Sequence, residues 1–362
     1  MWNLDDASYI ARKTDQLTTA LRRAGFDDVA LSSPSRTAPG ERRRMDLATR
    51  RTNSGVVLGL HRQRSKDIVD LTTCLVLHPA LVALLPPLRR VLVRLQALRR
   101  DASVIANLLD SGPDVLLRTD APLMLSDRLA LTDFARSHAL PRISWARGND
   151  EPEPVIILQP PTISLSGVAA TPPAGAFLQA SASGEAAIIA AVLGALPTKG
   201  SIAEFYAGCG SITFAMARHA RVTAWEGDAA SSSALRQAAN HAGLAPRIAV
   251  TQRDLTRQPL QTKELAAFAA VVLDPPFAGA AAQAAHIAAA KVPVVVYVSC
   301  NPATLGRDAR TLRQAGYRLV ASKPIDQFLW SEELESVSTF AIGSNPLDRS
   351  NEVGRSVLSA GG

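Results

Sequence analysis

The sequence has little cysteine and no long apolar run. Its three cysteines, Cys74, Cys209 and Cys300, are too few and too scattered for a disulfide framework, which suits a reducing compartment. No stretch reaches about 18 uninterrupted apolar residues, so no transmembrane helix is predicted. Residues 1–6 lack the basic and apolar regions of a signal peptide, so we expect a cytoplasmic protein. With 362 residues, the chain is long enough for two or three domains.

Positive charge is concentrated near the N-terminus. Residues 1–100 hold 18 Lys and Arg against 9 Asp and Glu, whereas the rest hold 21 against 23. Only Asp46 lies among the basic side chains Arg42, Arg43, Arg44, Arg50, Arg51, Arg62, Arg64 and Lys66. Such a region favours a polyanion such as RNA, bound through its phosphates. A well-solvated, arginine-rich surface is the alternative, and charge alone does not decide between them.

The N-terminal part reads as a mixed α/β region over residues 1–170. Residues 7–25 have helical periodicity that ends at Gly25, and this first helix could pack on the domain that follows. A basic amphipathic helix is expected over 79–100, with a possible break at Pro86-Pro87. Short antiparallel strands are predicted over 55–61 and 67–71, and further short strands are predicted within 102–170, including 102–105 and 154–158.

From residue 177 onward, helices and strands are predicted to alternate. This order predicts a doubly wound, mostly parallel sheet in a domain over 171–343, with a disordered tail at 344–362. The predicted helices cover 182–196, 211–219, 229–242, 279–290 and 303–315, and the predicted strands cover 201–206, 221–225, 247–251, 269–273, 292–298, 317–322 and 336–342.

Several polar groups follow these strands and predict a nucleotide-like cofactor site. Gly208 and Gly210 open the helix after the first strand, where glycine lets the backbone approach a ligand. Glu226 ends the next strand, where a carboxylate can accept hydrogen bonds from both ribose hydroxyls. Asp254 follows the third strand, and Asp274 is held by two prolines after the fourth. The third glycine of a dinucleotide fingerprint is replaced by Thr213, so the pattern fits S-adenosylmethionine as well as a nucleotide.

A Ser-Cys-Asn-Pro turn at residues 299–302 ends a further apolar strand. Cys300 would therefore sit at the carboxyl edge of the sheet, where active sites form. A buried inert thiol is the alternative for a lone cysteine.

Five motifs together resemble the RNA (uracil-5-)-methyltransferases that act on tRNA and ribosomal RNA, over residues 7–342. They are AFLQ at 176–179, FYAGCG at 205–210, LDPP at 273–276, VSCNP at 298–302 and LESV at 334–337. The resemblance implies a class I methyltransferase domain, Rossmann-like, beside a smaller N-terminal RNA-binding region. It implies S-adenosylmethionine contacts at Gln179, Tyr206, Ser211, Glu226, Asp254 and Asp274, beside the Gly208–Gly210 turn, with Cys300 as nucleophile and Glu335 as base.

Uracil explains why the resemblance needs a thiol and a carboxylate. Carbon 5 becomes reactive after a thiolate adds to carbon 6, and a base must then remove the carbon 5 proton. A surface acid is the alternative for Glu335, with Glu332 and Glu333 nearby in the sequence. The target base must leave its stack to reach such a site.

The chain departs from the family at three positions. Phe277 stands where Arg is usual, Ala207 where Cys is frequent, and Ile212 where Phe is common. An Asp-Pro-Pro-aromatic loop resembles enzymes that methylate exocyclic amines of RNA or DNA, and this rival function would leave Cys300 without a role. A catalytically silent RNA-binding form is the third hypothesis.

Cys74 matches the last of four iron–sulfur ligands in a ribosomal-RNA branch of the family. No cysteine precedes it, so this chain cannot build a four-thiolate cluster and no metal is expected. We hypothesise that Met1 is an internal methionine of a longer product; the alternative is a short form with Cys74 in its core. The match favours 23S rRNA over tRNA as substrate, and we expect a monomer without membrane contact.

Overall fold

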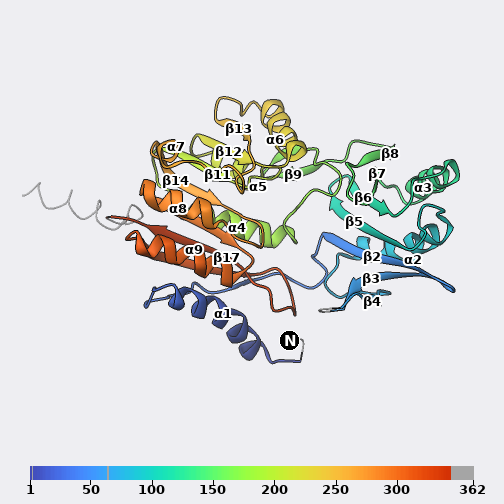
Figure 1. Ribbon diagram of the computed structural model, residues 1–362, viewed down its shortest axis with the longest axis horizontal. Helices are drawn as coiled ribbons and strands as arrows, with labels where there is room; N and C mark the ends of the chain where they lie inside the picture. The colour runs from blue at the N-terminus through green and yellow to red at the C-terminus, as the bar shows by residue number, and fades with distance from the viewer. Residues whose placement is uncertain (2, 63–64, 344–362) are drawn as a thin grey trace, which may run out of the picture. The chain divides into compact units, whose positions relative to one another are not determined.

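The computed structural model describes residues 1, 3–62 and 65–343, and it divides into two compact units (Figure 1). Unit 1 contains Met1–Arg36, Ala186–Ser232 and the chain from Gly243 onward, and unit 2 contains Thr37–Glu185 and Ser233–Ala242. Helix α1 (Asp6–Arg23) therefore belongs with the C-terminal half of the chain. The tail predicted at 344–362 lies outside the described residues.

Unit 1 is built on an eight-stranded sheet in the order β1-β16-β17-β15-β14-β11-β12-β13. Its parallel strands are β11 (Ser201–Phe205), β12 (Val222–Glu226), β13 (Ile248–Gln252), β14 (Phe268–Leu273) and β15 (Val294–Ser299). At the other side β17 (Glu335–Ala341) is antiparallel to β15 and to β16 (Arg318–Asp326), and β1 (Ser35–Arg36) is parallel to β16. The predicted doubly wound, mostly parallel α/β fold is confirmed.

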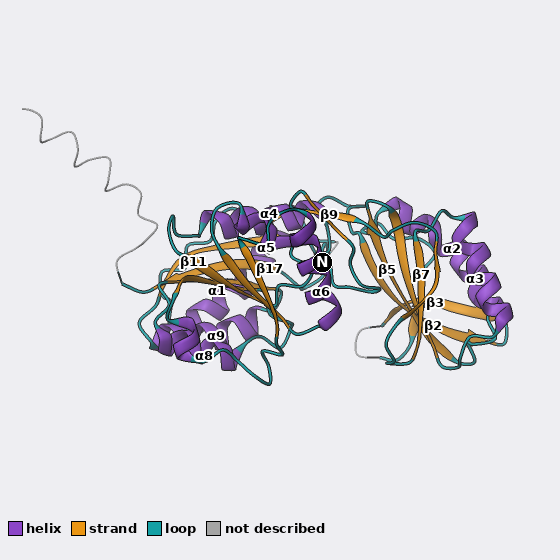
Figure 2. Ribbon diagram, turned by 90° about the horizontal axis from the view of Figure 1, so that it is seen from above, coloured by secondary structure: helices purple, strands orange, loops and turns teal. Residues whose placement is uncertain are grey.

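Helices cover both faces of this sheet. Figure 2 shows α8 and α9 on one face and α4 on the other. The central strands β14 and β15 consist almost entirely of buried apolar residues, as parallel strands covered on both faces require. The helices are α4 (Ala182–Gly194), α5 (Ser211–Ala217), α6 (Ala229–His241), α7 (Thr262–Leu265), α8 (Ala281–Ala290) and α9 (Pro302–Gln314).

Helix α1 packs against α9 through a stripe of buried residues at four-residue spacing. Leu17 and Leu21 of this stripe join the core beside Leu305 and Leu312 of α9. The two backbones approach closely at Gly306, where an added Cβ would lie 2.9 Å from the carbonyl oxygen of Ala20. The helix predicted over 7–25 is thus an integral part of unit 1.

Unit 2 contains a seven-stranded sheet in the order β4-β3-β2-β5-β6-β7-β8, mostly antiparallel, with β6 and β7 parallel. Its strands are β2 (Arg44–Thr52), β3 (Gly55–His61), β4 (Ile68–Asp70), β5 (Asp101–Leu109), β6 (Gly112–Thr119), β7 (Arg142–Arg147) and β8 (Glu153–Ile157), and a separate hairpin pairs β9 (Ile163–Leu165) with β10 (Val168–Ala170). Its own apolar core lies between this sheet and helices α2 (Pro79–Arg94) and α3 (Leu125–Ser137).

The prediction for α2 was wrong in two respects. The helix is continuous through Pro86 and Pro87, and it ends at Arg94 rather than at residue 100. Burial explains the continuity, because Leu84, Leu85 and Leu88 pack into the core and offset the hydrogen bonds that the prolines remove. Helix α3 and strands β6 and β7 were not predicted.

Candidate active site

The parallel strands of unit 1 deliver the predicted site residues to one edge of the sheet. Tyr206 follows β11, Glu226 ends β12, Asp254 follows β13, Asp274 follows β14 and Cys300 follows β15. Because β11 has β12 on one side and β14 on the other, the strand order reverses direction beside it, which is where α/β sheets bind ligands. The residues predicted from separate motifs therefore lie along one edge of the sheet.

The turn after β11 has an unusual backbone. Tyr206, Gly208 and Gly210 have positive φ angles of 62°, 54° and 101°. A left-handed conformation costs a non-glycine residue roughly 1 kcal/mol or more, so Tyr206 is held there by its surroundings. A Cβ on Gly208 would meet nothing within 4 Å, so the turn faces open space. The turn therefore leaves room for a ligand against its backbone.

Glu226 and Asp254 hold backbone N–H groups at this edge. The Glu226 carboxylate accepts hydrogen bonds from the backbone N–H of Gly208 at 2.7 Å and of Asp228 at 2.8 Å. It thus links the end of β12 to the turn after β11. Asp254 accepts from the N–H of Thr256 at 2.9 Å, and its side chain is 51% exposed. Asp254 is therefore a turn-capping acid at the rim of the edge.

Register brings Cys300 and Glu335 to the same end of the β15–β17 pair. The two strands are antiparallel, and their last pair is Ser299 with Ser336. Cys300 directly follows Ser299, and Glu335 is the first residue of β17. Cys300 is half-buried, whereas Glu335 is buried and 4% exposed. A thiol and a carboxyl group thus lie together at the carboxyl edge, where the Glu335 carboxyl group acts on the pKa of the Cys300 thiol.

One oxygen of Glu335 is held and the other has no partner. Gln327 donates a hydrogen bond from Nε2 to Glu335 Oε2 at 3.0 Å. Within the described part of the chain, Glu335 Oε1 is buried without a hydrogen-bond partner. Desolvation by burial, with the negative charge of Asp274 next in size, raises the pKa of Glu335 above its ordinary value. An unpartnered carboxyl oxygen with a raised pKa suits a proton acceptor.

The same surroundings keep Cys300 protonated in the free protein. Desolvation is the main cause, and the carboxyl groups of Glu335 and Asp274 add to it, so the pKa of the Cys300 thiol rises to about 12. Both carboxyl groups act on the thiol, which supports their placement beside it. The site needs a bound cation or a bound substrate to favour the thiolate.

Sequence reasoning missed two buried polar residues of the site, Gln327 and Glu204. Gln327 lies in the segment between β16 and β17 and orients Glu335, and no motif marked it. Glu204 lies inside β11, where burial is the main cause that raises its pKa to about 8, with Asp274 and Glu226 contributing. A lone glutamate within the apolar strand residues 201–205 was the signal that could have found it.

Two further predicted residues belong to unit 2. Gln179 is buried, and its carbonyl oxygen accepts a hydrogen bond from Arg43 Nε at 3.0 Å. Cys74 is half-buried and packs against the apolar core of this unit. Among the residues that the structure describes, no group of three or more His, Cys, Asp or Glu side chains could hold a metal ion, and no helix is long and apolar enough to cross a membrane.

The residues at the edge fit S-adenosylmethionine. The open space beside Gly208 leaves room for a ligand against the turn. The Glu226 carboxylate lies at the end of β12, where ribose hydroxyls would be bound. Each Glu226 oxygen accepts one hydrogen bond in the structure, which leaves a lone pair on each for a further donor. Asp274 supplies negative charge near Cys300, which suits a sulfonium cation.

Fold and site together define a class I methyltransferase. A family profile for tRNA (Uracil-5-)-methyltransferase matches residues 171–340. An RNA methyltransferase of Mesorhizobium japonicum is 37% identical over 91% of this chain and 78% of that protein, and one of Brucella melitensis is 37% identical over 93% and 80%. The chain therefore belongs to the RNA (uracil-5-)-methyltransferase family, whose members use S-adenosylmethionine.

Two other relatives show how far the similarity extends. The 23S rRNA (uracil(1939)-C(5))-methyltransferase RlmD of Edwardsiella ictaluri is 35% identical over 79% of this chain and 65% of that protein. The tRNA (uracil-54, C5)-methyltransferase of Pyrococcus abyssi, solved with S-adenosyl-L-homocysteine, matches with a TM-score of 0.68 and 18% identity. It covers 92% of this chain and 83% of its own, and it shows the shared fold.

Proposed function

We propose that this chain methylates carbon 5 of a uridine in 23S rRNA, with Cys300 as nucleophile and Glu335 as base. The observation that supports the proposal most is the β15–β17 register, which brings the Cys300 thiol and the Glu335 carboxyl group to one end of the strand pair. Among the described residues, one oxygen of that carboxyl group has no hydrogen-bond partner. The similarity to RlmD and the position of Cys74 favour 23S rRNA over tRNA.

The proposed reaction uses both groups in turn. Cys300 gives up its proton to water, and its sulfur forms a bond to carbon 6 of the uracil, which makes carbon 5 nucleophilic. When bound, S-adenosylmethionine supplies the electrophilic methyl group that carbon 5 takes. Glu335 then removes the proton from carbon 5, the carbon–sulfur bond breaks, and the sulfur leaves with its electron pair. Gln327 keeps the Glu335 carboxyl group in place throughout.

Other residues are proposed to hold the cofactor and the RNA. Tyr206, Gly208, Gly210, Ser211, Glu226, Asp254 and Asp274 of unit 1 would contact S-adenosylmethionine. The contact expected of Gln179 stays a prediction. Residues 171–343 would form the catalytic domain, and residues 1–170 would form the RNA-binding region. Helix α1 is the exception within residues 1–170, because it belongs to unit 1.

The arginines of unit 2 divide between structural and exposed positions. Arg51 donates to the carbonyl oxygens of Leu95 and Leu98, both at 2.7 Å, and so caps the end of α2. Arg43 pairs with Glu185. By contrast, Arg62 and Lys66 are exposed and form no ion pair with any residue that the structure describes. The exposed basic residues are the ones that we propose to contact RNA phosphates.

Nucleoside mass spectrometry tests the proposed reaction. The purified chain and S-adenosylmethionine are incubated with unmodified 23S rRNA or tRNA, and the RNA is digested and analysed. We expect 5-methyluridine in 23S rRNA, loss of this product with Cys300→Ala, and retention with Cys74→Ala, which removes the half-buried cysteine of unit 2. A methylated adenine or guanine would support the amine reaction instead, and no product would support a silent RNA-binding form.

A further inference from the structure

Phe277 is an exposed aromatic ring on a firmly held loop. It follows the Asp-Pro-Pro turn after β14, and it is 63% exposed. Its carbonyl oxygen accepts hydrogen bonds from Asn301 Nδ2 at 3.0 Å and from Thr304 Oγ1 at 3.3 Å. Arg307 Nη2 donates to the carbonyl oxygen of Ala278 at 2.9 Å. The start of α9 therefore fixes the backbone that presents the exposed ring.

This loop is joined directly to the candidate nucleophile. Asn301 follows Cys300 in the chain, and it holds both the Phe277 carbonyl and, through Oδ1, the N–H of Ala303 at 3.1 Å. Phe277 is therefore anchored one residue away from Cys300. A strand whose uridine reaches Cys300 must place a neighbouring nucleotide near this ring.

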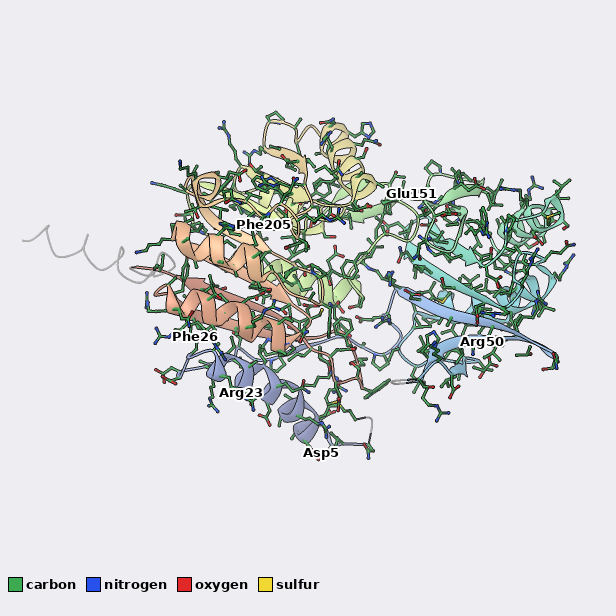
Figure 3. All side chains as sticks on the ribbon, in the orientation of Figure 1. Asp5, Arg23, Phe26, Arg50, Glu151 and Phe205 are labelled. Atoms are coloured by element: carbon green, nitrogen blue, oxygen red, sulfur yellow. The ribbon has the colours of Figure 1, made fainter. Side chains whose placement is uncertain are left out.

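A groove between α1 and α9 begins at the same residues. It has a volume of about 600 Å³ and is lined by Asn301, Pro302 and Arg310 on one side and by Asp15, Thr19 and Arg23 of α1 on the other. Figures 1 and 2 both show α1 beside α9, and Figure 3 labels Arg23 on α1. The groove thus continues from the Cys300-Asn301-Pro302 turn along unit 1.

The charge of the groove comes from two arginines. Arg307 also lines it, but its Nε donates to the buried Asp308 carboxylate at 2.8 Å, which offsets its charge. Arg310 Nη2 donates to the carbonyl oxygen of Arg23 at 3.1 Å, which brings the two residues together without neutralising either. Within the described part of the chain, neither Arg23 nor Arg310 forms an ion pair. Asp15 is the acid that opposes them.

We propose that Phe277 and this α1–α9 groove bind a single strand of the substrate RNA on either side of the target uridine. An exposed aromatic ring beside a groove with positive charge is the combination that binds single-stranded nucleic acid, because a base stacks on the ring and phosphates meet the cations. In this arrangement Phe277 stacks on a base next to the uridine, and Arg23 and Arg310 contact phosphates. The inference rests on the proposed function for the identity of the strand.

Salt dependence separates the two kinds of contact. Binding of a short, fluorescently labelled single-stranded RNA with one uridine is measured by anisotropy over a series of salt concentrations. Phe277→Leu should weaken binding about tenfold with an unchanged salt slope, because stacking releases no counterions. Phe277→Trp should bind as the wild type does. The double variant Arg23→Gln/Arg310→Gln should weaken binding and reduce the slope by about 1 to 1.5, since each phosphate contact on a single strand contributes about 0.7.

Two further variants control for charge and folding. Arg221→Gln removes an exposed arginine just before β12, at the opposite edge of the sheet, and should leave affinity and slope unchanged. Asp15→Asn removes the opposing acid and should tighten binding, an effect that misfolding cannot produce.

The proposal is overturned if Phe277→Leu binds as the wild type does, or if the double variant is indistinguishable from Arg221→Gln. The proposed function is tested separately by 5-methyluridine formation. If the wild type methylates RNA but these variants do not change binding, the proposed RNA-binding face is refuted and the proposed function stands. If the variants change binding as predicted but no 5-methyluridine forms, the RNA-binding face stands and the proposed function is refuted.

Discussion

Replacing Lys13 should destabilise unit 1 far more than replacing its neighbour on the same helix. Lys13 is 2% exposed, and its ammonium group donates to Asp326 Oδ1 at 2.7 Å and to the carbonyl oxygens of Phe328, at 2.9 Å, and Glu333. These acceptors span the segment from the end of β16 to the residue before Leu334-Glu335. Lys13→Met keeps much of the apolar stem and removes the charge, so Asp326 is left buried without its cation.

The magnitude follows from what remains around Asp326. Removing one partner of a buried ion pair costs about 3–5 kcal/mol. Asp326 keeps a hydrogen bond from the Tyr9 hydroxyl at 2.7 Å, and Arg36 lies 3.9 Å away. We therefore expect a loss near the lower limit, about 3 kcal/mol in the free energy of unfolding. Arg12→Met is the matched control, because Arg12 pairs with Glu332 at 2.9 Å with side chains 56% and 61% exposed, and such pairs contribute about 0–1 kcal/mol.

Urea unfolding followed by circular dichroism at neutral pH measures both variants. The expected result is a clear fall in the unfolding midpoint for Lys13→Met and almost none for Arg12→Met. Equal, small losses for both variants would refute the conclusion that α1 is held to the β16–β17 segment by this buried pair. Because that segment ends at Glu335, methyl transfer by Lys13→Met should also fall under conditions where the variant is still folded.

Three further predictions come from other buried groups. Burial raises the pKa of Glu204 from 4.5 to about 8, so between these pH values the folded state binds more protons than the unfolded state and loses stability as pH rises. Glu204→Gln should therefore raise the melting temperature at pH 8 more than at pH 5. An equal change at both pH values would contradict the raised pKa. Glu335 also has a raised pKa and must be ionised to act as a base, so the single-turnover rate of methyl transfer should rise with pH above neutrality. Glu335→Gln should lose this step of the pH profile and keep the rise at higher pH that comes from ionisation of Cys300. The same profile in the variant and the wild type would argue for another base. Gly306→Ala would place a Cβ 2.9 Å from the Ala20 carbonyl oxygen, so the free energy of unfolding should fall by about 1–3 kcal/mol, measured by thermal unfolding. An unchanged melting temperature would mean that α1 and α9 separate easily.

Local sequence patterns predicted the catalytic half of the fold well. Strands β11, β12, β14 and β15 are short, mostly apolar runs that are followed by glycine, acid-proline or cysteine turns, and such runs need no distant partner to be recognised. Because carboxyl ends of parallel strands share an edge, the neighbourhood of Glu226, Asp274 and Cys300 could be predicted without coordinates.

What depends on distant contacts could not be predicted. The pairing of Ser299 with Ser336, which brings Cys300 and Glu335 to one end of the strand pair, is a matter of register between strands far apart in the sequence. Lys13 occupies the apolar stripe of α1 with Leu17 and Leu21, yet nothing in the sequence names Asp326 as its partner. Gln327 could not be predicted for the same reason, since its hydrogen bond to Glu335 depends on where β17 lies in the fold.

The central claim is that Cys300 forms a covalent bond to the uracil that is methylated. RNA carrying 5-fluorouridine at the target position tests it directly, because fluorine at carbon 5 cannot be removed as a proton and the adduct cannot resolve. With S-adenosylmethionine present, we expect a protein–RNA complex that survives denaturing electrophoresis and maps to a peptide containing Cys300. Cys74→Ala should form this complex and Cys300→Ala should not. Formation of 5-methyluridine by Cys300→Ala on unmodified RNA, or an adduct at another residue, would contradict the account.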